Sequence, residues 1–311
     1  MPKFKIPINK TKIIRTLLFA LCLAVIITVP IMATVKKADK ADADEMNVLT
    51  LWQIDGFEGG KGSRATYLQN LSDEFSKNKG CYITVNSLSA DAARLNLNNG
   101  NVPDLISYGA GMYGIEGYIR GDNLYYNWCN GGYCFLSVDT SAKFDDISTT
   151  NLVINGGTGN LVSAAALLCG VNGAEVVKPT AAYVKLINGD YKYLLGTQRD
   201  IFRLRTRGVA FTIKPITEFN DLYQNISITC TDAKKSIFAK QFIEYLLENQ
   251  DGITSLGLLA AGKSLYDDEM RLMEGINYAC RLTTPINEGF KNEINKSIIN
   301  CDIKNLKNLL N

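Results

Sequence analysis

The chain has 311 residues, of which 46% are hydrophobic and 21% charged, with a formal net charge of +2. This is ordinary globular composition, and the length is sufficient for two compact lobes. Residues 1–46 carry eight Lys or Arg and four Asp or Glu, so the rest of the chain is net −2 and offers no basic face for nucleic acid. Histidine is absent, which removes the commonest general base and metal ligand; we expect no catalysis, no cofactor and no metal site.

The amino terminus has the pattern of a membrane segment. Lys3 to Arg15 is basic, and an uncharged, largely apolar run follows from Thr16 to Val35. Its length suits a membrane span of roughly 17–25 residues and exceeds a signal-peptide core of about 7–15. The basic flank predicts that the remainder lies outside the cytoplasm. We favour an uncleaved anchor, with a cleaved signal peptide as the alternative, and interpret Lys36 to Glu45 as a charged linker.

The first folded unit is predicted to be a strand, a glycine-rich loop and a helix. Val48 to Ile54 is apolar, Asp55 to Ser63 holds four glycines, and Arg64 to Asn78 repeats apolar residues at helical spacing. Ser63 is placed to cap the helix. In α/β proteins the carboxyl ends of strands and the amino ends of helices face a crevice that binds ligands. The pattern therefore predicts a binding site near this loop.

Further strands and helices alternate along the chain, which predicts a mainly parallel sheet. Extended segments are expected at Cys81–Leu88, Val102–Gly111, Gly131–Asp139, Leu152–Asn155 and Ile226–Cys230. Helices are expected at Asp91–Gly100, Leu161–Gly170, Pro179–Ile187, Ala233–Asn249 and through Tyr266–Asn311. Tyr191–Ile213 has the pattern strand, loop, helix, strand, and Lys214–Asn225 would cross back to the first unit. Tyr108 to Trp128 is rich in glycine and tyrosine and is expected to be irregular.

Seven of the eight cysteines lie beyond the apolar amino-terminal run. An exported chain permits disulfides, and a turn of four residues could join Cys129 to Cys134. Cys81 and Cys169 stand in apolar contexts and are interpreted as small core residues.

Several runs carry a family resemblance, namely LWQIDGFEGGKGSR, NGNVPDLISYG, GGY, NGGTGN, LGTQRDIFRL and FNDLYQNISI. Together they resemble the extracellular solute-binding proteins of bacterial ABC importers, most nearly the large family with many sugar binders. The resemblance covers about Val48 to Leu265. It implies an α/β, two-lobed periplasmic-binding-protein-like fold (type II) with a ligand cleft between the lobes. Residues 47–128 and 215–311, including the carboxyl-terminal helices, would form lobe 1, and residues 129–214 lobe 2. The chain looks shorter than typical members and lacks a lipobox.

Loop and aromatic residues in these runs are candidate ligand contacts. Trp52 and Trp128 could stack on a ligand ring, with a core role as the alternative for Trp52. Asp55 and Glu58 could accept hydrogen bonds from hydroxyl groups or pair with a cation, although loop acids are often simply solvated.

Later segments supply the remaining candidates. Gly156 and Gly157 would let the backbone approach a ligand. Gln198, Arg199 and Asp200 open a helix after a strand, where Arg199 could clamp a carboxylate or form a structural ion pair. Asp221 and Tyr223 lie near the return crossing, where members of the resembled family place cleft residues.

The leading hypothesis is an extracytoplasmic solute-binding protein, not an enzyme. It would capture a small ligand, a sugar or oligosaccharide, and deliver it to ABC permease subunits in the membrane; nucleic acid is not an expected partner. One alternative is a membrane-anchored surface scaffold or sensor with the same fold. A less favoured one is a glycoside hydrolase, which needs two carboxylates roughly 5–10 Å apart, here Glu58 with Asp200 or Asp221.

Overall fold

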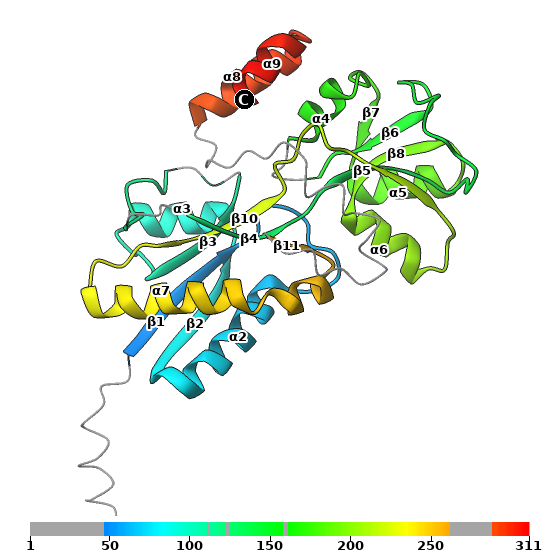
Figure 1. The fold of residues 1–311 in the computed structure, drawn as a ribbon. Helices are drawn as coiled ribbons and strands as arrows, with labels where there is room; N and C mark the ends of the chain where they lie inside the picture. Colours follow the sequence, from blue (N-terminus) through cyan, green and yellow to red (C-terminus); the bar gives the residue numbers. More distant parts are fainter. Residues whose placement is uncertain are drawn as a thin grey trace, which may run out of the picture. The chain divides into compact units, whose positions relative to one another are not determined.

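The computed structural model describes residues 47–110, 112, 114–121, 125–157, 161–261 and 288–310. Figure 1 shows these residues as coloured ribbon. The predicted membrane segment, Thr16 to Val35, and the linker after it lie outside the described residues. Within the described ranges, no helix is both long enough and apolar enough to cross a membrane.

A six-stranded sheet is built from both ends of the described chain. Its strands, in spatial order, are β11 (Leu259–Ala260), β4 (Tyr126–Asn130), β10 (Tyr223–Ile228), β3 (Leu105–Gly109), β1 (Asn47–Ile54) and β2 (Cys81–Leu88). β1 and β3 are parallel, with Trp52 opposite Ile106, whereas β10 runs antiparallel to both β3 and β4. The sheet is therefore mixed, and the prediction of a mainly parallel sheet is wrong, because β10 returns late in the sequence and runs antiparallel to both of its neighbours.

The middle of the chain forms a separate five-stranded sheet. Its strands, in spatial order, are β7 (Glu175–Val177), β6 (Leu152–Asn155), β8 (Tyr193–Thr197), β5 (Tyr133–Ser137) and β9 (Thr212–Pro215). β6 pairs parallel with β7 and β8, and β5 pairs antiparallel with β8 and β9. The division into two sheets agrees with the predicted two-lobe organisation, and the assignment of particular residues to lobes stays a prediction.

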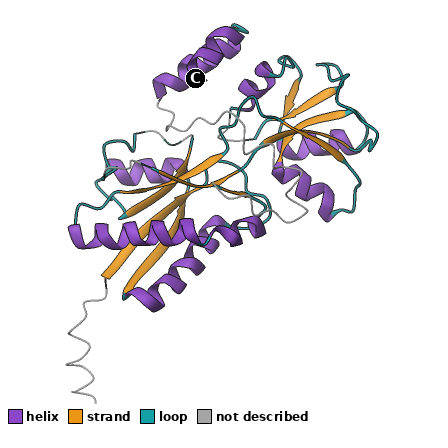
Figure 2. Cartoon of the chain, in the orientation of Figure 1, coloured by secondary structure: helices purple, strands orange, loops and turns teal. Residues whose placement is uncertain are grey.

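Helices accompany both sheets (Figure 2). They are α2 (Arg64–Lys79), α3 (Ala90–Asn98), α4 (Val162–Leu168), α5 (Pro179–Ile187), α6 (Gln198–Thr206), α7 (Ala233–Glu248), the 3-10 helix η1 (Gln250–Leu256), α8 (Glu288–Ile299) and α9 (Ile303–Leu310).

The predicted strand, loop and helix at the start of the domain are confirmed. β1 is followed by a loop and then by α2, whose amino end is capped by Ser63 Oγ accepting from Thr66 N at 3.2 Å. At the other end Gly80 adopts φ 62°, the left-handed conformation that terminates helices. Leu68 and Phe75 on α2 are almost fully buried, so the helix is held by its apolar face.

Two local sequence predictions differ from the structure. The segment from Tyr108 to Trp128, expected to be irregular, runs into strand β4 (Tyr126–Asn130). This strand pairs with β10, and the local sequence does not predict that pairing. Cys129 and Cys134 are both free thiols, since they lie on strands of different sheets, and so the predicted bridge is not made. On α7, Ile237 is 59% exposed.

In the prediction from sequence, the carboxyl-terminal helices belong to the first lobe. In the structure α8 and α9 contact α4, and Asn172 Nδ2 lies 3.0 Å from Cys301 Sγ. Ile294 and Leu306 are fully buried in the same cluster as the three alanines of α4, Ala164–Ala166. Small side chains on α4 leave an apolar surface that these helices cover, and the grouping of residues 215–311 stays a prediction.

Replacement of Phe242 by alanine should be severely destabilising. Its ring is fully buried on α7 and meets Phe75 edge-on, with centroids 5.5 Å apart and planes at 73°. We expect Phe242→Ala to lower the free energy of unfolding by about 3–5 kcal/mol, measured by urea denaturation. Ile237→Ala on the same helix should cost no more than about 0.5 kcal/mol. Equal losses in the two variants would contradict this packing.

Candidate functional site

Two chain segments connect the sheets, and they are hydrogen-bonded to each other. Gly131 N donates to Leu222 O at 2.6 Å, and Ile216 N donates to Tyr133 O at 3.0 Å. The side chain of Asn220 adds a bond from Nδ2 to Gly131 O at 2.9 Å. This pairing continues β4 with β10 on one side and β5 with β9 on the other. The result is one two-stranded crossing ribbon (residues 130–134 and 215–223) that belongs to both sheets.

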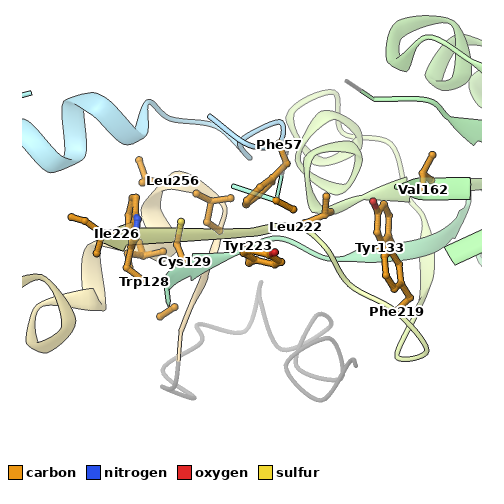
Figure 3. Packing of buried hydrophobic residues seen from close by; sticks show 14 of the residues in the cluster. Phe57, Trp128, Cys129, Tyr133, Val162, Phe219, Leu222, Tyr223, Ile226 and Leu256 are labelled. Carbon is orange, nitrogen blue, oxygen red and sulfur yellow. The ribbon is translucent and has the colours of Figure 1, made fainter. Parts of the chain in front are cut away.

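A hydrogen bond between a tyrosine and an aspartate stabilises the centre of the crossing ribbon. Tyr133 Oη donates to Asp221 Oδ1 at 2.6 Å, and Leu161 N donates to Asp221 Oδ2 at 2.6 Å. The ring of Tyr133 stacks on Phe219 with centroids 6.4 Å apart, as Figure 3 shows. Burial raises the pKa of Asp221 to about 6, against the opposing effect of its two hydrogen bonds. Asp221 therefore serves to position the crossing.

The loop after β1 is held in place by a buried arginine. Arg64 is 2% exposed, and its Nη1 donates to Asp55 Oδ1 at 3.0 Å and to Phe57 O at 3.1 Å. Its guanidinium also lies over the Phe57 ring, 4.2 Å from the centroid. Asp55 accepts a second bond from Gln53 Nε2 at 2.9 Å. The carboxylate of Asp55, a predicted ligand contact, is thus engaged in holding the loop.

On the second sheet, α6 begins directly after β8 and has a complete capping box. Thr197 Oγ1 accepts from Arg199 N at 3.3 Å, and Asp200 Oδ2 accepts from Thr197 N at 3.1 Å. Asp200 is fully buried and also accepts from Asn155 Nδ2 at 2.7 Å and Arg203 Nη1 at 3.1 Å. Burial raises the pKa of Asp200, while these bonds act to lower it. Asp200 is therefore a capping residue that also fixes the orientation of Asn155.

The first two residues of α6 reach the loop after β1. Gln198 Oε1 accepts from Gly132 N at 3.0 Å, and Gln198 Nε2 donates to Glu58 O at 3.2 Å. Arg199 Nη1 forms an ion pair with Glu58 Oε1 at 3.1 Å. The side chains of Arg199 and Glu58 are 36% and 28% exposed, so the pair is accessible to solvent. This pair joins a loop of one sheet to a helix of the other.

A small cavity of about 10 Å³ lies among these groups. It is lined by residues of the first sheet's loop, of the second sheet and of the crossing ribbon, namely Phe57, Glu58, Asn155, Gly157, Thr197 and Leu222. Two of the lining residues, Phe57 and Leu222, are labelled in Figure 3. Asn155 is 3% exposed, and its Oδ1 has no hydrogen-bond partner within the described part of the chain.

The structure brings together only some of the predicted contact residues. Glu58, Gly157, Gln198 and Arg199 meet at the cavity or its edge, and Asp200 and Asp221 support it from buried positions. Gly156 lies in the adjoining turn, where its N–H donates to Val177 O at 2.8 Å.

The large aromatic candidates lie in the core. Trp128 is fully buried, with Nε1 donating to Ser107 Oγ at 3.0 Å and its ring stacked 6.0 Å from Tyr67. Trp52 is 9% exposed and Tyr223 is 3% exposed. None of the three presents an open ring face, because each sits on a strand covered by other side chains.

Sequence reasoning missed four residues that line the cavity: Phe57, Asn155, Thr197 and Leu222. Thr197 could have been found, because Thr197 and Asp200 have the spacing of a capping box before an apolar run. Asn155 is the last residue of a strand and precedes two glycines. This pattern also indicates a residue near the site, but less specifically than the capping box does. Among the described residues, no group of three or more His, Cys, Asp or Glu side chains is arranged to hold a metal ion.

No protein-family model matches the sequence, and no curated protein matches it. Solved structures do match. Iron-bound HitA from Pseudomonas aeruginosa superposes with a TM-score of 0.52 and 11% identity, covering 82% of this chain and 99% of that one. Trichodesmium IdiA (FutA), in complex with iron and citrate ligands, gives a TM-score of 0.54 and 11% identity, covering 85% and 99%. At this identity the likeness establishes the fold, and the predicted two-lobed, periplasmic-binding-protein-like α/β fold is confirmed.

The raised pKa of Asp221 predicts a pH-dependent stability. Its value of about 6 lies above the ordinary 3.8, so the folded state binds the proton more tightly than the unfolded chain. The contribution of Asp221 to the free energy of unfolding is fully present below about pH 4. As the pH rises through 6, this contribution is lost, and the free energy of unfolding falls by about 2–3 kcal/mol. Asp221→Asn mimics the protonated form and should lack this component. Urea denaturation of both proteins from pH 4 to pH 7.5 measures the difference, and parallel stability profiles would refute it.

Proposed function

We propose that this chain is an extracytoplasmic solute-binding protein that captures a small ligand between two lobes and delivers it to an ABC importer. One observation carries the proposal. Side chains from the loop after β1, from β6 and from the β8–α6 junction line the same cavity beside the crossing ribbon. In α/β proteins this is the expected position of a ligand, outside the carboxyl ends of the strands. The shared fold with the iron-bound proteins supports the same role.

In this proposal the crossing ribbon is the hinge for ligand capture. Three residues, 131–133, face seven residues, 216–222, so the ribbon is irregular between its two regular ends. Such a segment can absorb changes in backbone angles while each sheet stays intact. A ligand that contacts both lobes favours the closed arrangement by its preferential affinity for it. A permease that recognises the closed arrangement would then receive only loaded protein.

The sequence resemblance favours a sugar, and the site itself offers polar recognition. Both tryptophans are buried, and Phe57 is 4% exposed with one ring face covered by Arg64. Stacking of a sugar ring on an open aromatic face, the role proposed for Trp52 and Trp128, therefore has little support here. A sugar bound through hydrogen bonds alone stays within the proposal.

The hydrolase alternative is weakened by the positions of its acids. Asp200 and Asp221 are both buried and hydrogen-bonded within the capping box and the crossing ribbon. Neither lines the cavity that Glu58 borders. A general acid and a nucleophile must both reach the scissile bond, and among the described residues Glu58 is the one carboxylate that lines this cavity.

Thermal unfolding against a ligand panel tests the proposal. The panel contains monosaccharides, oligosaccharides, amino acids, ferric citrate and free metal ions. A compound present at about one hundred times its dissociation constant adds roughly 2.7 kcal/mol to stability. For a chain of this size that corresponds to a rise in Tm on the order of 5–10 °C.

The variant Gln198→Ala removes the side chain that joins Gly132 to Glu58 and should weaken the ligand-induced rise in Tm. Lys240→Ala, on the exposed side of α7, serves as its control and should leave the rise unchanged. Absence of any shift across the panel would contradict ligand capture and favour a surface scaffold or sensor with this fold.

A further inference from the structure

The accessible edge of the cavity carries one negative and one positive side chain. Glu58 comes from the loop after β1 and Arg199 from the first turn of α6, and in this structure they neutralise each other at 3.1 Å. The two residues follow strands of different sheets, β1 and β8. A ligand that enters between the two segments therefore has to separate this ion pair or bind around it.

Charge balance restricts what can separate the pair. A ligand with a single charge would pair with one of the two side chains and leave the other to solvent, so it would gain less than a ligand that pairs with both. A ligand with one cationic and one anionic group replaces the partner of each side chain and leaves no charge unpaired. Arg199 suits a carboxylate because a guanidinium binds its two oxygens in a bidentate manner.

A buried acceptor points to the same ligand chemistry. Asn155 lines the cavity, and its Nδ2 donates to the carboxylate of Asp200 at 2.7 Å. That bond fixes the amide orientation, since a carboxylate can only accept, and leaves Oδ1 as the free acceptor. This oxygen is buried and has no partner within the described residues. A buried acceptor without a partner is costly, so a donor group from the ligand would stabilise it.

We propose that the ligand is a zwitterionic amino carboxylate, an α-amino acid or a short peptide. Its ammonium group binds Glu58 and Asn155 Oδ1, and its carboxylate binds Arg199. This inference rests on the proposed function and specifies its ligand class. It departs from the sugar expected from the sequence, because the charged pair and the buried acceptor are present, while among the described residues that line the cavity no aromatic side chain is exposed.

Thermal unfolding and calorimetric titration of the full chain test the inference. The probes are the twenty standard amino acids and a set of dipeptides. Each probe that raises Tm is compared with its carboxamide, which lacks the carboxylate, and its N-acetyl derivative, which lacks the ammonium. We expect at least one amino carboxylate to raise Tm and both derivatives to bind at least tenfold more weakly.

Charge-removing variants distinguish recognition from a structural role. Glu58→Gln should weaken the zwitterion at least tenfold and reduce or reverse the preference for it over the N-acetyl derivative. Arg199→Gln should also weaken binding of the zwitterion at least tenfold, and it should reduce or reverse the preference for the zwitterion over the carboxamide. Lys185→Gln removes one partner of the Lys185–Glu175 pair on the second sheet, whose exposures of 32% and 41% are similar, and should change no affinity. Ligand-free Tm values confirm that each variant folds.

Three results overturn the inference in different ways. If a sugar or ferric citrate raises Tm and no amino carboxylate does, the ligand class is wrong and the proposed function stands. If no compound of either panel raises Tm, the proposed function fails as well. An amino carboxylate whose affinity is unchanged in both charge-removing variants would also overturn the assignment of Glu58 and Arg199.

Discussion

The backbone pairing of the two crossing segments is the constraint on which the rest of the site depends. The bonds from Gly131 to Leu222 and from Ile216 to Tyr133 keep the two strands together as they pass from one sheet to the other. Because the two sheets share the ribbon, the loop after β1 and the start of α6 lie next to each other. Gln198 makes this explicit, since its amide bonds both Gly132 in the ribbon and Glu58 in the loop.

Buried polar groups with several hydrogen bonds fix the geometry of this region. Asp221 bonds to Tyr133 and to the backbone of Leu161, and Asp200 caps α6 while holding Asn155. Burying a carboxylate is unfavourable unless its hydrogen bonds are well formed, so each of these groups tolerates little displacement. The accessible pair of Glu58 and Arg199 is different, because solvent screens it and leaves it free to exchange partners. The buried groups thus hold the geometry of the site, and in the proposed complex the ligand would contact the accessible pair.

The sequence predicted the elements with a clear periodicity and missed those defined by distant partners. The strand, loop and helix from Val48 to Asn78 were predictable from apolar spacing and a capping serine. Glu58, Gln198 and Arg199 were predictable because they follow strands. β4 was missed, since its partner β10 lies far along the chain. Trp128 was predicted as a ligand platform because residue type does not reveal which side of a strand is covered, and the structure buries it.

Small-angle X-ray scattering tests the central claim most directly, because capture between lobes joined by a crossing ribbon changes the dimensions of the molecule. The radius of gyration of the full chain is measured alone and with the panel compound that raises Tm most. The account predicts a smaller radius with the ligand, and no such decrease in an Arg199→Gln variant exposed to the same concentration. A radius that is unchanged by a bound, stabilising ligand would contradict capture by closure of the two lobes.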